Sequence, residues 1–146
     1  MAAFTKVNDF VEHLAEGAHD LDTHQLTVAL SNVAPGSESS DPTADGNGLL
    51  ANVTEISYTN LSSRDITLTS SSQTSGTYKL VLQDLVLTAS GGSVGPFRYV
   101  YIYNDGTAVL TDPLIGVYDY GASITLNNTE TLTVNFDDTN GVLTIA

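Results

Sequence analysis

Three histidines and the carboxylates around them are the residues in this chain best suited to chemistry. His13, His19 and His24 are its only histidines. The neighbouring carboxylates are Glu12, Glu16, Asp20 and Asp22. Imidazole and carboxylate are zinc ligands, but these spacings fit no known zinc motif. A helix in this region would also place His13 and His19 on different sides. The sequence therefore predicts a solvated polar surface here, and no metal-binding residue.

Two polar turns carry oxygen atoms of the kind found in calcium loops. Residues 41–47 read Asp-Pro-Thr-Ala-Asp-Gly-Asn, and residues 137–140 read Asp-Asp-Thr-Asn. The first lacks the alternating aspartates and the distal glutamate of a calcium loop, and the second is similar. Aspartate and asparagine are also ordinary turn residues. Turns are the prediction for both segments, with calcium as the alternative, and no cofactor is assigned.

Catalytic motifs are missing from the sequence. The chain has no cysteine and no Gly-x-Ser-x-Gly elbow, so a nucleophile is not identified. The glycine-rich residues 91–95 lack the lysine of a phosphate loop and precede a predicted strand instead of a helix. Carboxylates that could pair for glycoside hydrolysis occur only in turns. We therefore expect a protein that is not an enzyme.

The charge of the chain excludes two classes of partner. The net charge is −13, and the only fixed cations are Lys6, Arg64, Lys79 and Arg98. Four cations cannot neutralise a phosphate backbone or hold an anionic membrane surface, so nucleic acid and membrane are not expected partners. The N-terminal residues lack the apolar core of a signal peptide, and no apolar run approaches the length of a membrane span. These features predict a protein made in a cytoplasm.

The elements that must position these residues are organised around one stretch, residues 97–103. With a period of two, one face carries the aromatic residues Phe97, Tyr99, Tyr101 and Tyr103. The other face carries Arg98, Val100 and Ile102. A strand that is apolar on both faces is normally central, and either covered twice or covered once and docked on a partner. We expect this strand to form the core of a β domain.

Tyrosine is the main aromatic residue, and the chain has no tryptophan. The seven tyrosines are Tyr58, Tyr78, Tyr99, Tyr101, Tyr103, Tyr118 and Tyr120. Tyrosine is enriched where one end of the ring is buried and the other is wet, which includes interfaces. We expect at least half of these rings to lie in the core, with a protein–protein interface as the second interpretation. A carbohydrate-binding surface would usually use tryptophan.

The remaining pattern predicts one all-β domain over residues 1–146, an antiparallel β-sandwich of jelly-roll type with roughly eight strands. A short arm (1–6) contains an edge strand (3–7). A short helix is expected within 8–18, with Asn8 as its N-cap and Gly17 at its end, because an apolar stripe at helical spacing runs through Phe10, Val11, Leu14, Ala15 and Ala18. The alternative is a strand at 7–14. A long loop covers 32–48. Further strands are expected at 25–31, where Leu26, Val28 and Leu30 point inward, and within 49–58 around Val53, Ile56 and Tyr58. One or two strands are expected over 77–89, and single strands at 65–69, 114–118, 123–126 and 142–145. Another is expected at 130–136, where Leu132, Val134 and Phe136 share a face. The 77–89 stretch changes phase at Gln83-Asp84, which predicts a break. Turns are expected at 70–76 and 119–121, and hairpin turns at 127–128 and 137–141.

Three blocks of the sequence carry a resemblance to a known family. They are residues 6–21 with 26–35, residues 75–80 running into 89–99, and residues 112–126 followed by 133–137. In this pattern the chain resembles a family of small structural proteins that tailed bacteriophages encode near their capsid genes. The resemblance spans nearly the whole chain and contains no catalytic motif.

This resemblance implies a virion protein. The expected role is capsid decoration, in which a homo-oligomer, expected to be a trimer, binds the outer surface of the shell of major capsid protein and stabilises it. The arm at 1–6 and the loop at 32–48 would then reach neighbouring subunits. The alternative is a tail or fibre component that binds glycans through its tyrosines, and a hydrolase comes third.

Overall fold

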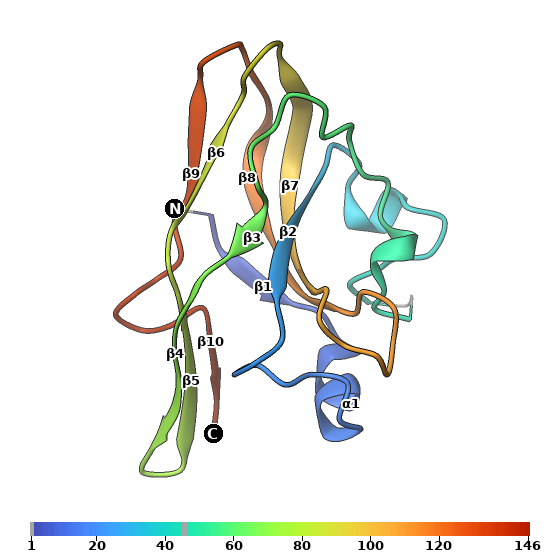
Figure 1. Ribbon diagram of the computed structural model, residues 1–146. Coiled ribbons are helices and arrows are strands. Elements are labelled where there is room, and N and C mark those ends of the chain that lie inside the picture. The colour runs from blue at the N-terminus through green and yellow to red at the C-terminus, as the bar shows by residue number, and fades with distance from the viewer. Residues whose placement is uncertain (1, 45–46) are drawn as a thin grey trace.

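The computed structural model describes residues 2–44 and 47–146, and it confirms an all-β antiparallel sandwich (Figure 1). The first layer is a five-stranded sheet with the spatial order β1 (Phe4–Lys6), β8 (Leu114–Leu126), β7 (Val94–Asn104), β2 (Leu26–Ser31) and β3 (Asp65–Ile66). The second layer holds β10 (Leu143–Ile145), β5 (Thr77–Leu82) and β4 (Leu68–Thr74), with the pair β6 (Leu85–Thr88) and β9 (Thr131–Val134). Short helices lie in the connections: α1 (Phe10–Ala15), η1 (Pro35–Ser37) and η2 (Leu50–Asn52). Jelly-roll connectivity stays a prediction.

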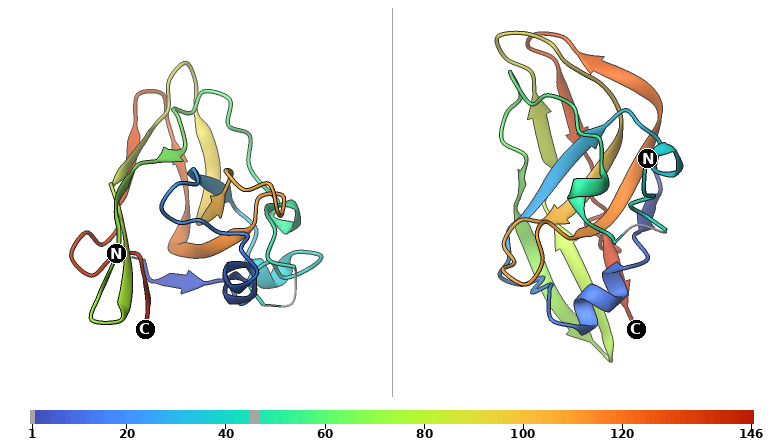
Figure 2. Two further views of the ribbon diagram at one scale, coloured as in Figure 1. Left: turned by 60° about the horizontal axis from the view of Figure 1, so that its bottom comes forward. Right: turned by 90° about the vertical axis from the view of Figure 1, so that its right-hand side faces the viewer.

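The predicted central strand is confirmed as β7, the middle strand of the five-stranded sheet. It is buried without interruption from Tyr99 to Asn104. The second layer covers one face of the sheet, and the segment between β2 and β3 covers the other (Figures 1 and 2). Both coverings come from the same chain, so the aromatic and the aliphatic face of this strand are each buried in the core.

Strand β2 differs from its predicted pattern. Leu26, Val28 and Leu30 are buried as expected, but Thr27, Ala29 and Ser31 are buried too. The two buried polar residues have partners, because the Ser31 hydroxyl donates to the carbonyl of Thr54 at 2.6 Å and the Thr27 hydroxyl donates to Oδ1 of Asp65 at 3.3 Å. The alternating pattern predicted that one face of this strand would contact solvent, but in the structure the serine and the threonine on that face contact protein.

The N-terminal segment forms the predicted edge strand and helix. Strand β1 pairs antiparallel with β8 of its own chain, with Phe4 opposite Tyr118. Helix α1 begins after Asp9, not Asn8, and the chain turns at Gly17 with φ of 81°. The predicted apolar stripe is partly wrong, because Val11 is 54% exposed.

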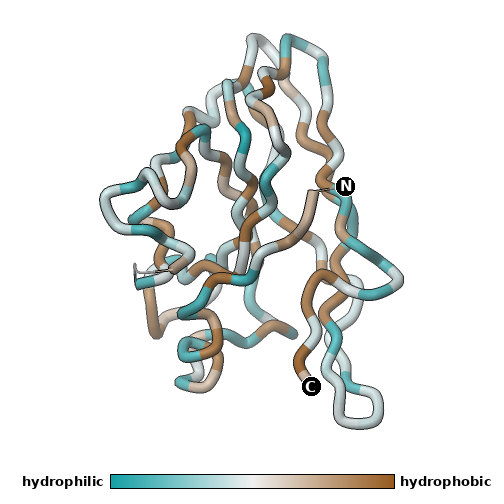
Figure 3. Tube along the Cα trace, turned by 180° about the vertical axis from the view of Figure 1, so that it is seen from behind, coloured by the Kyte–Doolittle hydropathy of each residue, from teal (hydrophilic) through white to brown (hydrophobic). Residues whose placement is uncertain are grey.

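Segments 49–58 and 70–76 correct the sequence prediction. The first holds η2 and single bridges, such as Ser31 to Glu55, in place of a strand. The second continues as β4 to Thr74 and turns only at Ser75 and Gly76. A run of serines and threonines pairs along β5 here, because backbone hydrogen bonds form a ladder whatever the side chains are. The outer end of this hairpin is accordingly pale in hydropathy (Figure 3).

Segment 119–121 is also not a turn that ends a strand. Strand β8 runs without a break from Leu114 to Leu126 and carries an irregularity where its pairing with β7 shifts between Tyr99 and Phe97. Gly121, with φ of 91°, provides the left-handed conformation that a bulge needs. The turn residues seen in the sequence therefore mark a bulge inside one long strand.

Two predictions about the second half of the chain have different outcomes. The break at Gln83-Asp84 is confirmed, because it separates β5 from β6. The turns at 127–128 and 137–141 are in place but do not make hairpins, because β9 pairs with β6 and β10 pairs with β5. The part of the chain that the structure describes forms ten strands where roughly eight were expected.

Candidate functional site

The structure brings the three histidines together, against the prediction of an exposed polar surface. The side chains of His13 and His19 are buried, and their ring centroids lie 6.2 Å apart. Helix α1 ends at Ala15, and the turn at Gly17 carries the chain back, so that the helical geometry that would have separated the two rings never reaches His19. This cluster, His13, His19 and His24, is the main group of titratable side chains that sequence reasoning misplaced.

Asn104, at the end of β7, fixes the protonation of two of these rings. Its Oδ1 accepts the backbone N–H of Gly106 at 2.9 Å, so its Nδ2 is the donating side. Nδ2 lies 3.2 Å from Nδ1 of His19 and 2.9 Å from Nδ1 of His24. Both Nδ1 atoms therefore accept, and in neutral imidazole the proton then sits on Nε2.

Burial and neighbouring rings keep His19 neutral. Desolvation, followed by the charges of His13 and His24, lowers the pKa of His19 to about 4. Nε2 of His19 and Nδ1 of His13 are buried and have no hydrogen-bond partner among the residues that the structure describes. Within residues 2–44 and 47–146 no serine or threonine hydroxyl bonds to a histidine ring, and no group of three or more acidic or histidine side chains is arranged to hold a metal. Through Asn104, the cluster joins the helical turn to β7.

The two polar turns use their carboxylates to bind their own backbone. Oδ1 of Asp41 accepts the N–H and the hydroxyl of Thr43 at 2.8 and 2.7 Å. Oδ1 of Asp137 accepts the N–H groups of Thr139 and Asn140 at 3.0 and 2.8 Å. These bonds lower the pKa of both aspartates. Asp45 and Gly46 of the first segment, part of the calcium alternative, lie outside the described residues.

The tyrosines confirm the core interpretation for at least half of them. Tyr99, Tyr101, Tyr103 and Tyr118 are buried. Tyr58 and Tyr78 are half-buried, and Arg64 lies over the ring of Tyr58, 3.7 Å from its centroid. Tyr120 is the exposed ring, at 52%. A sugar-stacking platform needs exposed ring faces, and a single ring does not make one.

Tyr101 offers a test of the core at its centre. Its ring is fully buried, its hydroxyl has no hydrogen-bond partner among the described residues, and its burial raises its pKa. Because a buried hydroxyl without a bond costs free energy, Tyr101→Phe is expected to leave stability unchanged or raise it by up to about 1 kcal/mol. Tyr101→Ala is expected to lose about 4 kcal/mol. Urea unfolding of both variants measures this, and a loss above about 1 kcal/mol in Tyr101→Phe would show that the hydroxyl has a partner.

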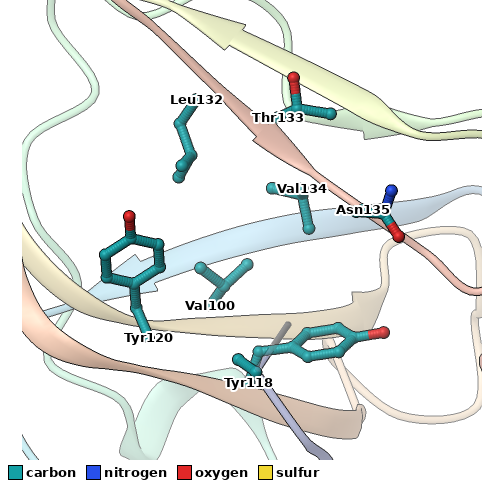
Figure 4. Close-up of a pocket in the computed structure, with 8 residues that line it drawn as sticks. Val100, Tyr118, Tyr120, Leu132, Thr133, Val134 and Asn135 are labelled. Carbon is teal, nitrogen blue, oxygen red and sulfur yellow. The ribbon is translucent and has the colours of Figure 1, made fainter.

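A groove of about 470 Å³ opens between the two layers, and we name it the edge groove (Figure 4). It is lined by Ala2, Val100, Tyr118, Tyr120, Leu132, Thr133, Val134 and Asn135. A second hollow of about 310 Å³ shares Ala2 and Tyr118 with it and continues to Asp137 and Val142. Burial, with the charges of Asp137 and Asp84, raises the pKa of Tyr118 to about 12. The edge groove is thus lined mainly by apolar side chains, and the hollow that adjoins it at Tyr118 contains the carboxylate of Asp137.

The cations of the chain are largely engaged within it. Nε and an Nη of Arg98 bind Asp119 at 2.7 and 2.8 Å, which raises the pKa of Arg98 and lowers that of Asp119. Arg64 donates to the carbonyl of Val28, and Nζ of Lys79 donates to the carbonyl of Thr139 at 3.0 Å. The exposed carboxylates therefore have few positive charges of their own chain beside them.

Comparison with known proteins found no matching family model, no similar curated protein and no similar solved structure. None of the described helices has the length and apolar character needed to cross a bilayer.

Proposed function

We propose that this chain is a structural protein of a tailed-phage virion, and that it decorates the outer surface of the capsid shell as a homotrimer bound to the major capsid protein. The resemblance described above supports this setting. The observation that carries the proposal is the charge distribution, with 17 acidic residues against 4 cations, three of them bonded inside the chain. Such a surface suits the outside of a shell, away from packaged DNA.

The proposed mechanism is mechanical. A sandwich whose central strand is covered on both faces is a stiff block, and each copy adds contact free energy at a joint between capsid subunits. Many modest contributions over a shell oppose the pressure of packaged DNA. The described parts of the arm and the loop are held by their own domain, since β1 pairs with β8 and Glu38 accepts the N–H of Thr54 at 2.8 Å. We therefore expect the joint to form without a free arm from this chain.

Binding to shells tests the proposal. Purified protein is mixed with capsids that lack it, the shells are sedimented, and the bound copies are counted and located by cryo-electron microscopy. We expect many copies spread over the shell, and shells that resist heating better than undecorated ones. A few copies at a single vertex would favour the tail component instead. Absence from both shell and tail, or turnover of a polysaccharide or ester by the pure protein, would overturn the proposal.

A further inference from the structure

The edge groove is an open side of the sandwich. Val100 and Tyr118 come from the large sheet, and Leu132 and Val134 come from β9 in the other layer. Figure 4 shows Leu132 and Val134 pointing toward Val100 and Tyr120, while Thr133 points away. Tyr120 is 52% exposed although it lies beside these apolar side chains. The space between the layers is therefore apolar and accessible.

Strand β9 has one unpaired edge beside this space. Within residues 2–44 and 47–146 it pairs only with β6. The N–H of Thr88 bonds to the hydroxyl of Ser62, and its C=O accepts the N–H of Ser62, so Thr88 directs both groups away from β9. Thr88 lies opposite Thr131, and antiparallel pairs alternate between bonded and non-bonded. Thr131 and Thr133 therefore turn their backbone groups to the unpaired edge.

This edge also lacks the usual protection against another strand. Proline, lysine and inward-pointing charge normally block an exposed edge. Strand β9 reads Thr-Leu-Thr-Val and has none of them. Its alternate residues Leu132 and Val134 line the groove, so a strand added beside them would place its own alternate side chains over Val100 and Tyr120.

The charges near the edge groove indicate which kind of polypeptide could bind there. Two carboxylates lie at one end of the groove: Asp84 accepts a bond from Nδ2 of the lining residue Asn135 at 3.2 Å, and Asp137 lines the hollow that adjoins the groove at Tyr118. The chain as a whole carries −13. A second copy would bring the same negative charge, and three of its four cations are already engaged. A segment with lysine or arginine between apolar residues would be attracted instead.

We propose that the edge groove binds an extended, basic segment of another protein, which pairs with the unpaired edge of β9 and inserts its alternate apolar side chains between the two layers. This inference rests on the proposed function, because it names the kind of capsid segment that the joint would use. Main-chain hydrogen bonds provide affinity in this mode, and the alternate side chains provide specificity.

A peptide library tests the groove without any capsid. The full chain is used to select from peptides of about nine residues whose alternate positions are apolar. The intervening positions are drawn from Lys, Arg and Thr in one half of the library, and from Asp, Glu and Thr in the other. We expect enrichment of the basic half, and binding of selected peptides that weakens as salt is raised.

Two variants and one control locate the binding. Tyr120→Ala removes an exposed ring of the groove, and Thr133→Pro removes an N–H from the unpaired edge, a position where strands tolerate proline. Each is expected to weaken peptide binding about tenfold or more. Val86→Ala is the matched control, because Val86 is 51% exposed on β6 opposite Thr133 and does not line the groove. It is expected to bind as the unchanged protein does.

The outcomes separate the two proposals. No enrichment, equal enrichment of the acidic half, or unchanged binding by Tyr120→Ala and Thr133→Pro overturns the groove proposal. Self-association that both variants abolish overturns it as well, in favour of a second copy. Shell binding that survives in both variants refutes the groove proposal alone, whereas absence of shell binding by the unchanged protein refutes the proposed function.

Discussion

Replacement of Gly116 by alanine is expected to lower the free energy of unfolding by about 3 kcal/mol. Gly116 is buried in β8, and the ring of Phe4 on β1 lies directly over it. An added Cβ would overlap that ring and come within 2.7 Å of the carbonyl oxygen of Thr5. The backbone of β1 cannot yield as a flexible side chain would, so β1 must move away from β8. Urea or thermal unfolding measures the loss.

Two companion variants show whether the overlap is the cause. Gly36→Ala is the matched control, because Gly36 is exposed and its nearest neighbour would be Oδ2 of Asp41 at 3.8 Å. It is expected to change stability by less than about 0.5 kcal/mol. Phe4→Ala removes the overlapping ring, so the double variant is expected to lose less than the sum of the single losses. Equal losses for Gly36→Ala and Gly116→Ala would refute this account of β1.

The central strand could be predicted because the residue pattern that defines it lies within one short stretch of the sequence. In residues 97–103 aromatic positions alternate with Arg98, Val100 and Ile102, and a strand that is apolar on most of both faces has few places to lie other than the middle of a sheet. The bulge in β8 could not be predicted in this way. Asp119, Tyr120 and Gly121 are typical of a turn, and only the pairing of both halves of β8 with β7 shows that the chain continues past them.

The histidine cluster and the edge groove could not be predicted from the sequence, because they depend on contacts between segments that are far apart along the chain. The amide of Asn104 lies 85 residues along the chain from His19, and no local pattern relates them. The edge groove combines β7, β8 and β9, so its lining depends on strand order. The alternation of Leu132, Val134 and Phe136 was visible in the sequence, but it could not show that β9 would pair with β6 and leave its other edge unpaired.

Acid is expected to destabilise the protein through His19. Its pKa is about 4 in the folded chain, compared with 6.5 for an unperturbed histidine. Between these values the unfolded chain binds a proton that the folded chain does not, so unfolding is favoured as the pH falls. The contribution of the neutral His19 to the free energy of unfolding is fully present above pH 6.5 and is lost progressively toward pH 4. A shift of this size corresponds to about 3 kcal/mol.

His19→Gln separates this effect from the titration of carboxylates. Glutamine does not titrate, and its side-chain oxygen can accept the bond from Nδ2 of Asn104. Asp20, Asp41, Asp119 and Asp137 also have lowered pKa values, but they are common to both proteins and cancel in the comparison. We expect the stability of His19→Gln relative to the unchanged protein to rise by about 3 kcal/mol between about pH 7 and pH 4.

Urea unfolding at a series of pH values measures that difference, and NMR titration of the His19 ring provides an independent reading. The neutral, Nε2-protonated ring that Asn104 fixes is expected to persist well below pH 6 in the folded chain. Parallel stability curves for the two proteins, or a titration midpoint near that of an exposed histidine, would show that the ring is reached by solvent. A ring that gains a charge must either bind a partner or contact water, because a buried charge without a partner costs free energy. That outcome would therefore show that the helical turn does not pack tightly enough on β7 to exclude water from His19.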